Sequence, residues 1–552
     1  MNRRRAIKIL AGGAITVAAA AGAYYALPPE FKGMKPTTQT TTTQPTATQL
    51  GPRYGGTARL GYWGTGGPVN LNPLFAFNTP AYSFVYHFYE KLVDQHVRTF
   101  EFYPKLARSW DISPDAKEYA FNLVRNATWH DGKPFTSADV KFTLEALIGV
   151  GQGGPMWARV NSIEKIETPD DYTVVVTHKT PNGAWISDLA QGFSGLYMVP
   201  KHLFEGTDLL KNPYNLKPVG TGPFKFVEWT PSHIRGIRYE NYWQKDKPYL
   251  DEIVWSIFPN APTMIAALEA KDIDVASGSS IDASQFQRLS ARSDLVSVKW
   301  DHTQINYIAF NLTKAPFSDK RVRYAIAHAI DRQGMSAKLG GLNQPVDGTY
   351  LPIVKWAYNP DAKQPEYNPD KAKQLLDEAG YKPGGDGIRF KTSLLLITFT
   401  IWPDIAAIVR DDLSKVGIDC EIKNVESASW FPMQQRGEYD MGINSGAHGP
   451  DPHEYRNQVA SYGFRNVMKY NNPRVDELFS EGVSVSAREE RAKYYFEIQK
   501  ILAEDMPRLN LLMDVRMAFH PPEFHGGYWE PTVPAGEYDH TLMWTEKGKP
   551  SP

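Results

Sequence analysis

Hydrophobic positions change their period within the stretch Ile305–Arg332, which divides the chain more clearly than any other. The run from Tyr307 to Phe310 is apolar and predicts a short strand that Pro316 interrupts. Ser318 then stands where a helix N-cap is expected, since its hydroxyl can accept from a free backbone N–H. Apolar side chains follow at helical spacing and define one face: Val322, Ala325, Ile326, Ala329 and Ile330. A strand that feeds a capped amphipathic helix is typical of the start of an α/β layer.

The rest of the body alternates in the same way, so the pattern predicts an α/β fold. The cap signals predict helices that begin at Thr79–Pro80 and run to about Val93, and that begin after Thr136 and Asn368. A long helix is expected over Arg488–Asp505, because Pro507 closes it. Further strands are predicted at Tyr119–Val124, Phe224–Trp229, Ile253–Phe258, Ile418–Lys423 and Tyr439–Ile443.

The N-terminus carries the pattern of an export signal. Arg3, Arg4 and Arg5 precede an apolar stretch from Ile9 to Leu27, and the arginines resemble a twin-arginine signal. The stretch is either cleaved after export or retained as an anchor, because it is close to the ~20 residues that span a bilayer. The Thr-rich tract Pro36–Gln49 has too little apolar surface to fold and predicts a linker. We therefore expect an extracytoplasmic body, exported and tethered to the outer face of the cytoplasmic membrane.

Composition narrows the classes of function. A chain of 552 residues predicts about three structural units, and the hydrophobic and charged contents of 42% and 22% are those of a soluble globular body. A formal net charge of −1 gives no general attraction to nucleic acid. Cys420 is the only cysteine, so the sequence excludes an internal disulfide and cysteine-ligated clusters, and we expect a buried thiol.

Six runs, spread over most of the chain, resemble one family. Besides the crossing stretch at Ile305 they are Leu106–Leu123, Trp129–Leu147, Val219–Trp229, Asn368–Tyr381 and Glu489–Leu512. In this order they resemble the extracytoplasmic solute-binding proteins of ABC importers, in the family that binds oligopeptides, dipeptides, nickel complexes and cello-oligosaccharides. The resemblance implies an α/β, two-lobed periplasmic-binding-protein fold of the type II kind, with an extra domain inserted in the first lobe.

The resemblance also implies a division of the chain. Residues 1–27 form the signal or anchor and residues 28–50 the linker. Lobe I is expected from three segments, 51–89, 216–304 and 516–552, while residues 90–215 form the inserted domain and 305–515 form lobe II. The lobes would close on solute by bending near Ile305 and Val515.

No catalytic constellation emerges from the sequence. Ser194 is not in a nucleophile elbow, and no His-Glu-x-x-His run occurs. His448 and His453 flank a Pro-Asp-Pro turn and would supply only half of a metal site. We therefore expect no cofactor, no metal and no enzymatic activity. The alternative function is that of a secreted hydrolase acting on peptides or oligosaccharides.

The segment His448–His453 also bears on ligand binding. By resemblance, Asp451-Pro452 matches the family's Asp-Pro, but the acid that grips a peptide's α-ammonium falls on His448, and the family's tryptophan falls on Ser445. Trp430 matches a groove-lining tryptophan, while Trp63 and Trp402 are expected at the groove edge. These six residues are the predicted ligand site.

The expected function is therefore that of a monomeric receptor that delivers an oligomeric nutrient to the permease subunits of an ABC importer. Oligopeptide and oligosaccharide remain open as the ligand. A peptide needs an anion for its ammonium, whereas a sugar needs ring faces and uncharged hydrogen-bonding groups. Neither nucleic acid nor turnover of the ligand is expected.

Overall fold

The computed structural model describes residues 51–63, 70–75, 79–154, 156–191, 195–278, 281–399, 401–447, 449–531, 533–536 and 539–550. The predicted export segment and the Thr-rich linker, as well as His448 and Ser194, lie outside these residues. Within the described part of the chain, no helix is both long enough and apolar enough to cross a membrane.

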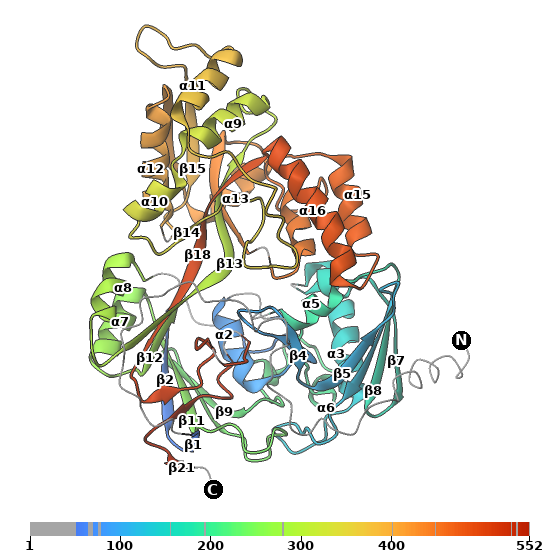
Figure 1. Ribbon diagram of the computed structural model, residues 1–552. Helices are drawn as coiled ribbons and strands as arrows, with labels where there is room; N and C mark the ends of the chain where they lie inside the picture. Colours follow the sequence, from blue (N-terminus) through green and yellow to red (C-terminus); the bar gives the residue numbers. More distant parts are fainter. Residues whose placement is uncertain are drawn as a thin grey trace, which may run out of the picture. The chain divides into compact units, whose positions relative to one another are not determined.

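One large sheet runs through the body (Figure 1). Its strands follow the order β16-β15-β17-β13-β18-β12-β2-β11-β10-β9, and β14 also pairs with β18. In chain order they are β2 (Thr57–Trp63), β9 (Phe224–Trp229), β10 (His233–Arg238), β11 (Glu252–Phe258), β12 (Val275–Gly278), β13 (Val296–Phe310), β14 (Gln344–Pro345), β15 (Phe390–Leu396), β16 (Ile418–Asn424), β17 (Met441–Ala447) and β18 (Arg508–His520).

Two long antiparallel strands, β13 and β18, make this path continuous. One end of β13 pairs with β17, whereas the far end of β18 pairs with β12. Their mutual register shifts between Asp301 and Ile305. The apolar run Tyr307–Phe310 is thus only the end of a strand of 15 residues, so the predicted short strand is too short. These two strands cross between the segments predicted as lobe I and lobe II, and the lobe boundaries themselves stay a prediction.

A second antiparallel sheet lies within the predicted inserted domain. Its order is β5-β6-β8-β7. Its strands are β5 (Ala107–Ile112), β6 (Glu118–Leu123), β7 (Ile163–Asp170) and β8 (Thr173–His178). The shorter pairs are β3 (Val93–Gln95) with β4 (Phe102–Pro104), β19 (Phe524–His525) with β20 (Trp544–Thr545), and β1 (Arg53–Tyr54) with β21 (Lys549–Pro550).

The helices follow local cap signals closely. Asn368 caps α11 by accepting from the backbone N–H of Lys371 at 3.0 Å, and the N–H of Thr136 donates to Asp139 at 2.9 Å at the start of α3. The predicted cap Ser318 is wrong by one residue, since Asp319 accepts from the N–H of Arg321 at 2.8 Å. The α-helices are α2 (Thr79–Phe88), α3 (Ser137–Val150), α4 (Trp157–Val160), α5 (Trp185–Ala190), α6 (Lys201–Phe204), α7 (Ala261–Glu269), α8 (Ala283–Ser290), α9 (Lys320–Ala329), α10 (Arg332–Lys338), α11 (Pro369–Glu378), α12 (Trp402–Ser414), α13 (Ser427–Gln435), α14 (Arg456–Val459), α15 (Pro473–Gly482) and α16 (Arg488–Asp505). Short 3₁₀ turns are η2 (Gly151–Gly153), η3 (Pro213–Asn215) and η4 (Pro452–Tyr455).

Alternate residues of β13 feed two different cores. Ile308 and Phe310 belong to the core that includes α9 and α12, and Tyr307 and Ala309 belong to the core beneath α15 and α16. Because successive side chains of a strand point to opposite faces, the sheet is buried on both sides here. The crossing strands are therefore held firmly at this end.

Candidate solute site at the crossing strands

Two of the predicted tryptophans lie together beside the crossing strands. Trp402 is the first residue of α12, and its ring centroid is 5.4 Å from that of Trp430 on α13. Phe399 packs against Trp402 with the centroids 5.3 Å apart and remains 42% exposed. The rings thus form an aromatic group that reaches the surface at Phe399. Trp63, in contrast, packs at the end of β2 against a different core, the one that holds α7 and α8.

The position of Trp402 is fixed by a chain of hydrogen bonds. Its indole N–H donates to Asn306 Oδ1 at 2.9 Å, and Asn306 Nδ2 donates to Asp514 Oδ1 at 2.6 Å. Asn306 is on β13 and Asp514 is on β18, next to the register shift between these strands. The aromatic group is thereby tied directly to the crossing strands.

Asp514 is a carboxyl group in a poorly solvated place. Burial raises the pKa of Asp514 to about 6, while the hydrogen bond from Asn306 and the charge of Arg516 oppose the rise. Sequence reasoning missed both Asp514 and Asn306. The available signal was the presence of polar residues inside two apolar runs, one around Ile305 and one around Leu512, since a polar group in such a strand needs a partner.

The loop after β17 holds the other predicted residues. Ser445, on β17, accepts a hydrogen bond from Gln304 Nε2 at 2.9 Å. Asp451 begins the turn η4 by accepting from the N–H of His453 at 2.9 Å. Burial, together with the charges of Arg456 and Arg491, holds the pKa of His453 well below its usual range, so this imidazole is neutral. Among the described residues, no group of three or more His, Cys, Asp or Glu side chains is placed to hold a metal ion.

Asp451 is engaged by an arginine. Arg491, on α16, donates from Nη1 and Nη2 to the two carboxylate oxygens, both at 2.7 Å, and both side chains are buried. Burial disfavours the charge of Arg491, but Asp451 and Tyr495 outweigh it, so the pKa of Arg491 lies above its ordinary value. An arginine therefore occupies the positions on Asp451 that a ligand ammonium would need.

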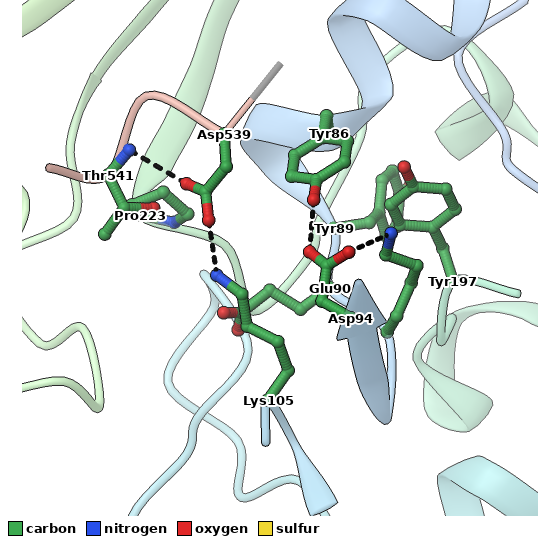
Figure 2. Close-up of a pocket in the computed structure, with 10 residues that line it drawn as sticks. Tyr86, Tyr89, Glu90, Asp94, Lys105, Tyr197, Pro223, Asp539 and Thr541 are labelled. Atoms are coloured by element: carbon green, nitrogen blue, oxygen red, sulfur yellow. Dashed lines mark hydrogen bonds and ion pairs between the residues drawn. The ribbon is translucent and has the colours of Figure 1, made fainter. Parts of the chain in front are cut away.

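A second group of buried charges lies within the predicted lobe I and inserted domain, around a cavity of about 10 Å³ (Figure 2). Lys105 bonds to Asp539 at 2.9 Å, and Lys91 bonds to Asp94 at 2.7 Å. The carboxylate of Glu90 accepts from Tyr242 and Trp243, and burial raises the pKa of Glu90. Such a volume holds about one water molecule, so this site serves the fold and is too small for a solute.

The continuous sheet with two crossing strands, and the aromatic group beside them, define the class of two-lobed periplasmic binding proteins. Residues 101–465 match the family described as bacterial extracellular solute-binding proteins, family 5. The chain belongs to this family.

Relatives and solved structures agree with this assignment. The heme-binding protein A of Haemophilus influenzae is 29% identical, over 79% of this chain and 84% of its own length. The oligopeptide-binding protein AppA of Bacillus subtilis is also 29% identical, over 70% of this chain and 74% of its own. The solved structure of an ABC transporter-associated periplasmic binding protein, DppA from Helicobacter pylori in complex with the peptide STSA, has a TM-score of 0.73 at 27% identity and covers 90% of this chain and 99% of that one. The expected fold class is thus confirmed, and the relatives are binding proteins.

Proposed function

We propose that this protein is a monomeric receptor that binds a short peptide between lobe I and lobe II and delivers it to the permease subunits of an ABC importer. The observation that carries the proposal is the aromatic group in which the buried Trp402 supports the half-buried Trp430 and the exposed Phe399, and which is tied through Asn306 to Asp514 on the crossing strands. Aromatic faces bind ligands of varied sequence, and a site at the hinge couples ligand contact to closure. The peptide-binding relatives support this class of ligand.

Asp514 is the anion we assign to the ligand's ammonium. The matched family position holds His448, and Asp451 is paired with Arg491. Asp514 remains partly accessible, and it accepts a hydrogen bond at 2.6 Å from a neutral amide, that of Asn306. An ammonium beside this carboxylate would stabilise its charged form, which burial disfavours. Ser445 and Trp63 remain proposed as outer contacts.

An oligosaccharide is the second candidate, because aromatic rings and the amides of Asn306 and Asn343 are also what a neutral sugar needs. Thermal melting separates the two. A library of peptides of two to eight residues, the same library N-acetylated, and cello-, xylo- and malto-oligosaccharides are each added to the protein. At a free concentration ~100 times the Kd, linkage predicts roughly 2.7 kcal/mol of added stability.

We expect the free peptides to stabilise the protein and the acetylated ones to fail. Trp430→Ala should weaken the effect and its tryptophan fluorescence signal, whereas Trp110→Ala, on β5, serves as a matched control. Asp514→Asn should remove the preference for the free ammonium. Stabilisation by sugars alone would support the second candidate, and conversion of the ligand to products would support a hydrolase instead.

The proposal includes export and tethering. Protease added to intact cells should release the body by cutting within Thr37–Gln49. A body that resists until the cells are lysed would contradict the extracytoplasmic location.

A further inference from the structure

The tip of the β3–β4 hairpin joins the inserted domain to lobe II. Phe100, in this tip, is only 6% exposed and belongs to the core beneath α15 and α16. Every other buried residue described in that core comes from the range 305–513. One aromatic side chain of the inserted domain is therefore packed inside lobe II.

The backbone of Phe100 is held in an unfavourable conformation. Its φ is +58°, in the left-handed region that a bulky L-residue rarely adopts. Such a conformation persists only when surrounding contacts stabilise it, and it marks positions whose placement matters for function. Here the hairpin itself supplies two backbone contacts, from His96 and Gln95, and the other predicted lobe supplies the packing around the side chain.

Arg488, the first residue of α16, binds the same hairpin from the lobe II side. Its Nη1 lies 2.9 Å from Glu101 Oε1, and its Nη2 donates to the carbonyl of Phe100 at 3.1 Å. Its guanidinium carbon lies 4.9 Å from the ring centroid of Phe102 and 5.5 Å from that of Trp356. One arginine thus contacts a hairpin strand of one region and an aromatic ring of the other.

A second contact lies nearby, before α5. The N–H of Gly183 donates to the carbonyl of Val483 at 2.8 Å. A Cβ at Gly183 would lie 2.1 Å from the carbonyl oxygen of Val485, so the two backbones approach more closely than any side chain would allow. Glycine is required here because of close approach, which indicates a fitted surface.

We propose that these contacts form an interlobe clasp, made of Phe100, Glu101 and Gly183 on one side and Val483 and Arg488 on the other. The clasp favours the closed arrangement whether or not a solute is present. If lobe II rotates about the crossing strands, Phe100 leaves its core, its pocket is exposed, and Arg488 loses Glu101 and the ring of Phe102 while it keeps that of Trp356. Opening then carries a cost that is independent of the solute, so solute affinity depends on residues that never touch it. The inference rests on the predicted division into moving lobes and does not depend on the ligand's identity.

The test measures the lobe separation in the full chain without any solute. Leu210→Cys and Tyr462→Cys, 72% and 59% exposed, place one nitroxide spin label in the inserted domain and one in lobe II, while Cys420 is buried. Pulsed electron resonance then gives the distribution of distances between the labels. We expect one dominant short distance in the parent, and a several-fold larger long-distance population in Phe100→Ser and Arg488→Gln.

Controls keep the test decisive. Arg474→Gln removes an exposed arginine of α15 that pairs within lobe II, and should leave the distribution unchanged. Gly183→Ala should widen the separation by steric contact alone, which provides a readout if Phe100→Ser does not fold, as judged by circular dichroism. Unchanged distributions in all folded clasp variants, or a parent that is already predominantly open, would overturn the proposal. Because no solute is added, failure here is distinct from failure of the peptide proposal.

Discussion

The buried pair of Asp451 and Arg491 offers the sharpest test of which residues serve the fold and which serve the ligand. Arg491 donates to both oxygens of Asp451 at 2.7 Å, to the carbonyl of Gly482 at 2.9 Å and to Tyr495 at 3.0 Å. In Asp451→Asn, the amide oxygen still accepts from one of the two nitrogens, but the negative charge is gone and Arg491 remains buried without a counterion. Removing one partner of such a pair costs about 3–5 kcal/mol, a large share of the ~5–15 kcal/mol of a typical protein.

The double variant Asp451→Asn, Arg491→Met separates charge from packing. It leaves no unpaired charge, so we expect it to recover at least half of the loss, with a coupling free energy of about 2 kcal/mol or more. Equilibrium unfolding in urea, followed by circular dichroism, gives each free energy. Glu490→Gln is the matched control on the same helix, since its partner Lys493 is 69% exposed and such pairs contribute less than ~1 kcal/mol.

The result also decides the role predicted for Asp451 in binding. If Asp451→Asn is as stable as Glu490→Gln, the reasoning about the buried pair is wrong. If Asp451→Asn is as stable as Glu490→Gln and peptides no longer stabilise it, Asp451 is a ligand residue. Loss of stability with an unchanged number of bound peptides per folded molecule assigns Asp451 to the fold.

Burial raises the pKa of Asp514 to about 6, so the folded state binds the proton of this carboxyl more tightly than the unfolded state does. The contribution of Asp514 to stability is therefore full below about pH 4 and is lost as the pH rises through 6. The loss is at most about 3 kcal/mol, and urea titrations across this range should show it in the parent and not in Asp514→Asn. Lys105→Met leaves Asp539 buried without its cation and should lower the free energy of unfolding by about 3–5 kcal/mol. The double variant Lys105→Met, Asp539→Asn should regain much of this loss. Equal stability of the single variant and the parent, measured by urea unfolding, would contradict the prediction. Burial raises the pKa of Cys420 to about 12, so iodoacetamide should modify it at least ~100-fold more slowly in the native protein than in urea, and equal rates would show an accessible thiolate.

Local signals in the sequence predicted local structure well. The helix α16 has the predicted bounds, Arg488–Asp505, and the cap at Asn368 is confirmed, because a cap is a bond between a side chain and its own backbone. Other boundaries were wrong, besides the cap at Ser318: the strand predicted over Tyr439–Ile443 is Met441–Ala447. The helix α2 ends at Phe88, not near Val93, since Val93 belongs to β3 and pairs with β4. The first half of β13 was not predicted as strand, because many of its side chains are polar and exposed.

The site depended on contacts that no local pattern reveals. The resemblance pointed to Trp430, and loop position alone pointed to Trp402. Asn306, however, meets Asp514 across 208 positions of sequence, and Arg491 meets Asp451 across 40. Neither pair shares a periodicity or a turn signal. A polar residue in an apolar run indicates that it has a hydrogen-bonding partner, but the sequence does not identify that partner.

The pairing of β1 with β21, and of β12 with β18, has a consequence for how the protein is made. Arg53 and Tyr54 lie opposite Pro550 and Lys549, and Ala276 lies opposite Phe519. A ribosome synthesises the first of these strands nearly 500 positions before its partner, so lobe I cannot finish its sheet until the last segment has emerged. All strands of lobe II except β18 are synthesised before this last segment. A chain interrupted before Arg508 would therefore present unpaired edges at β12 and β13 together, and such edges are where extended chains add to one another and aggregate.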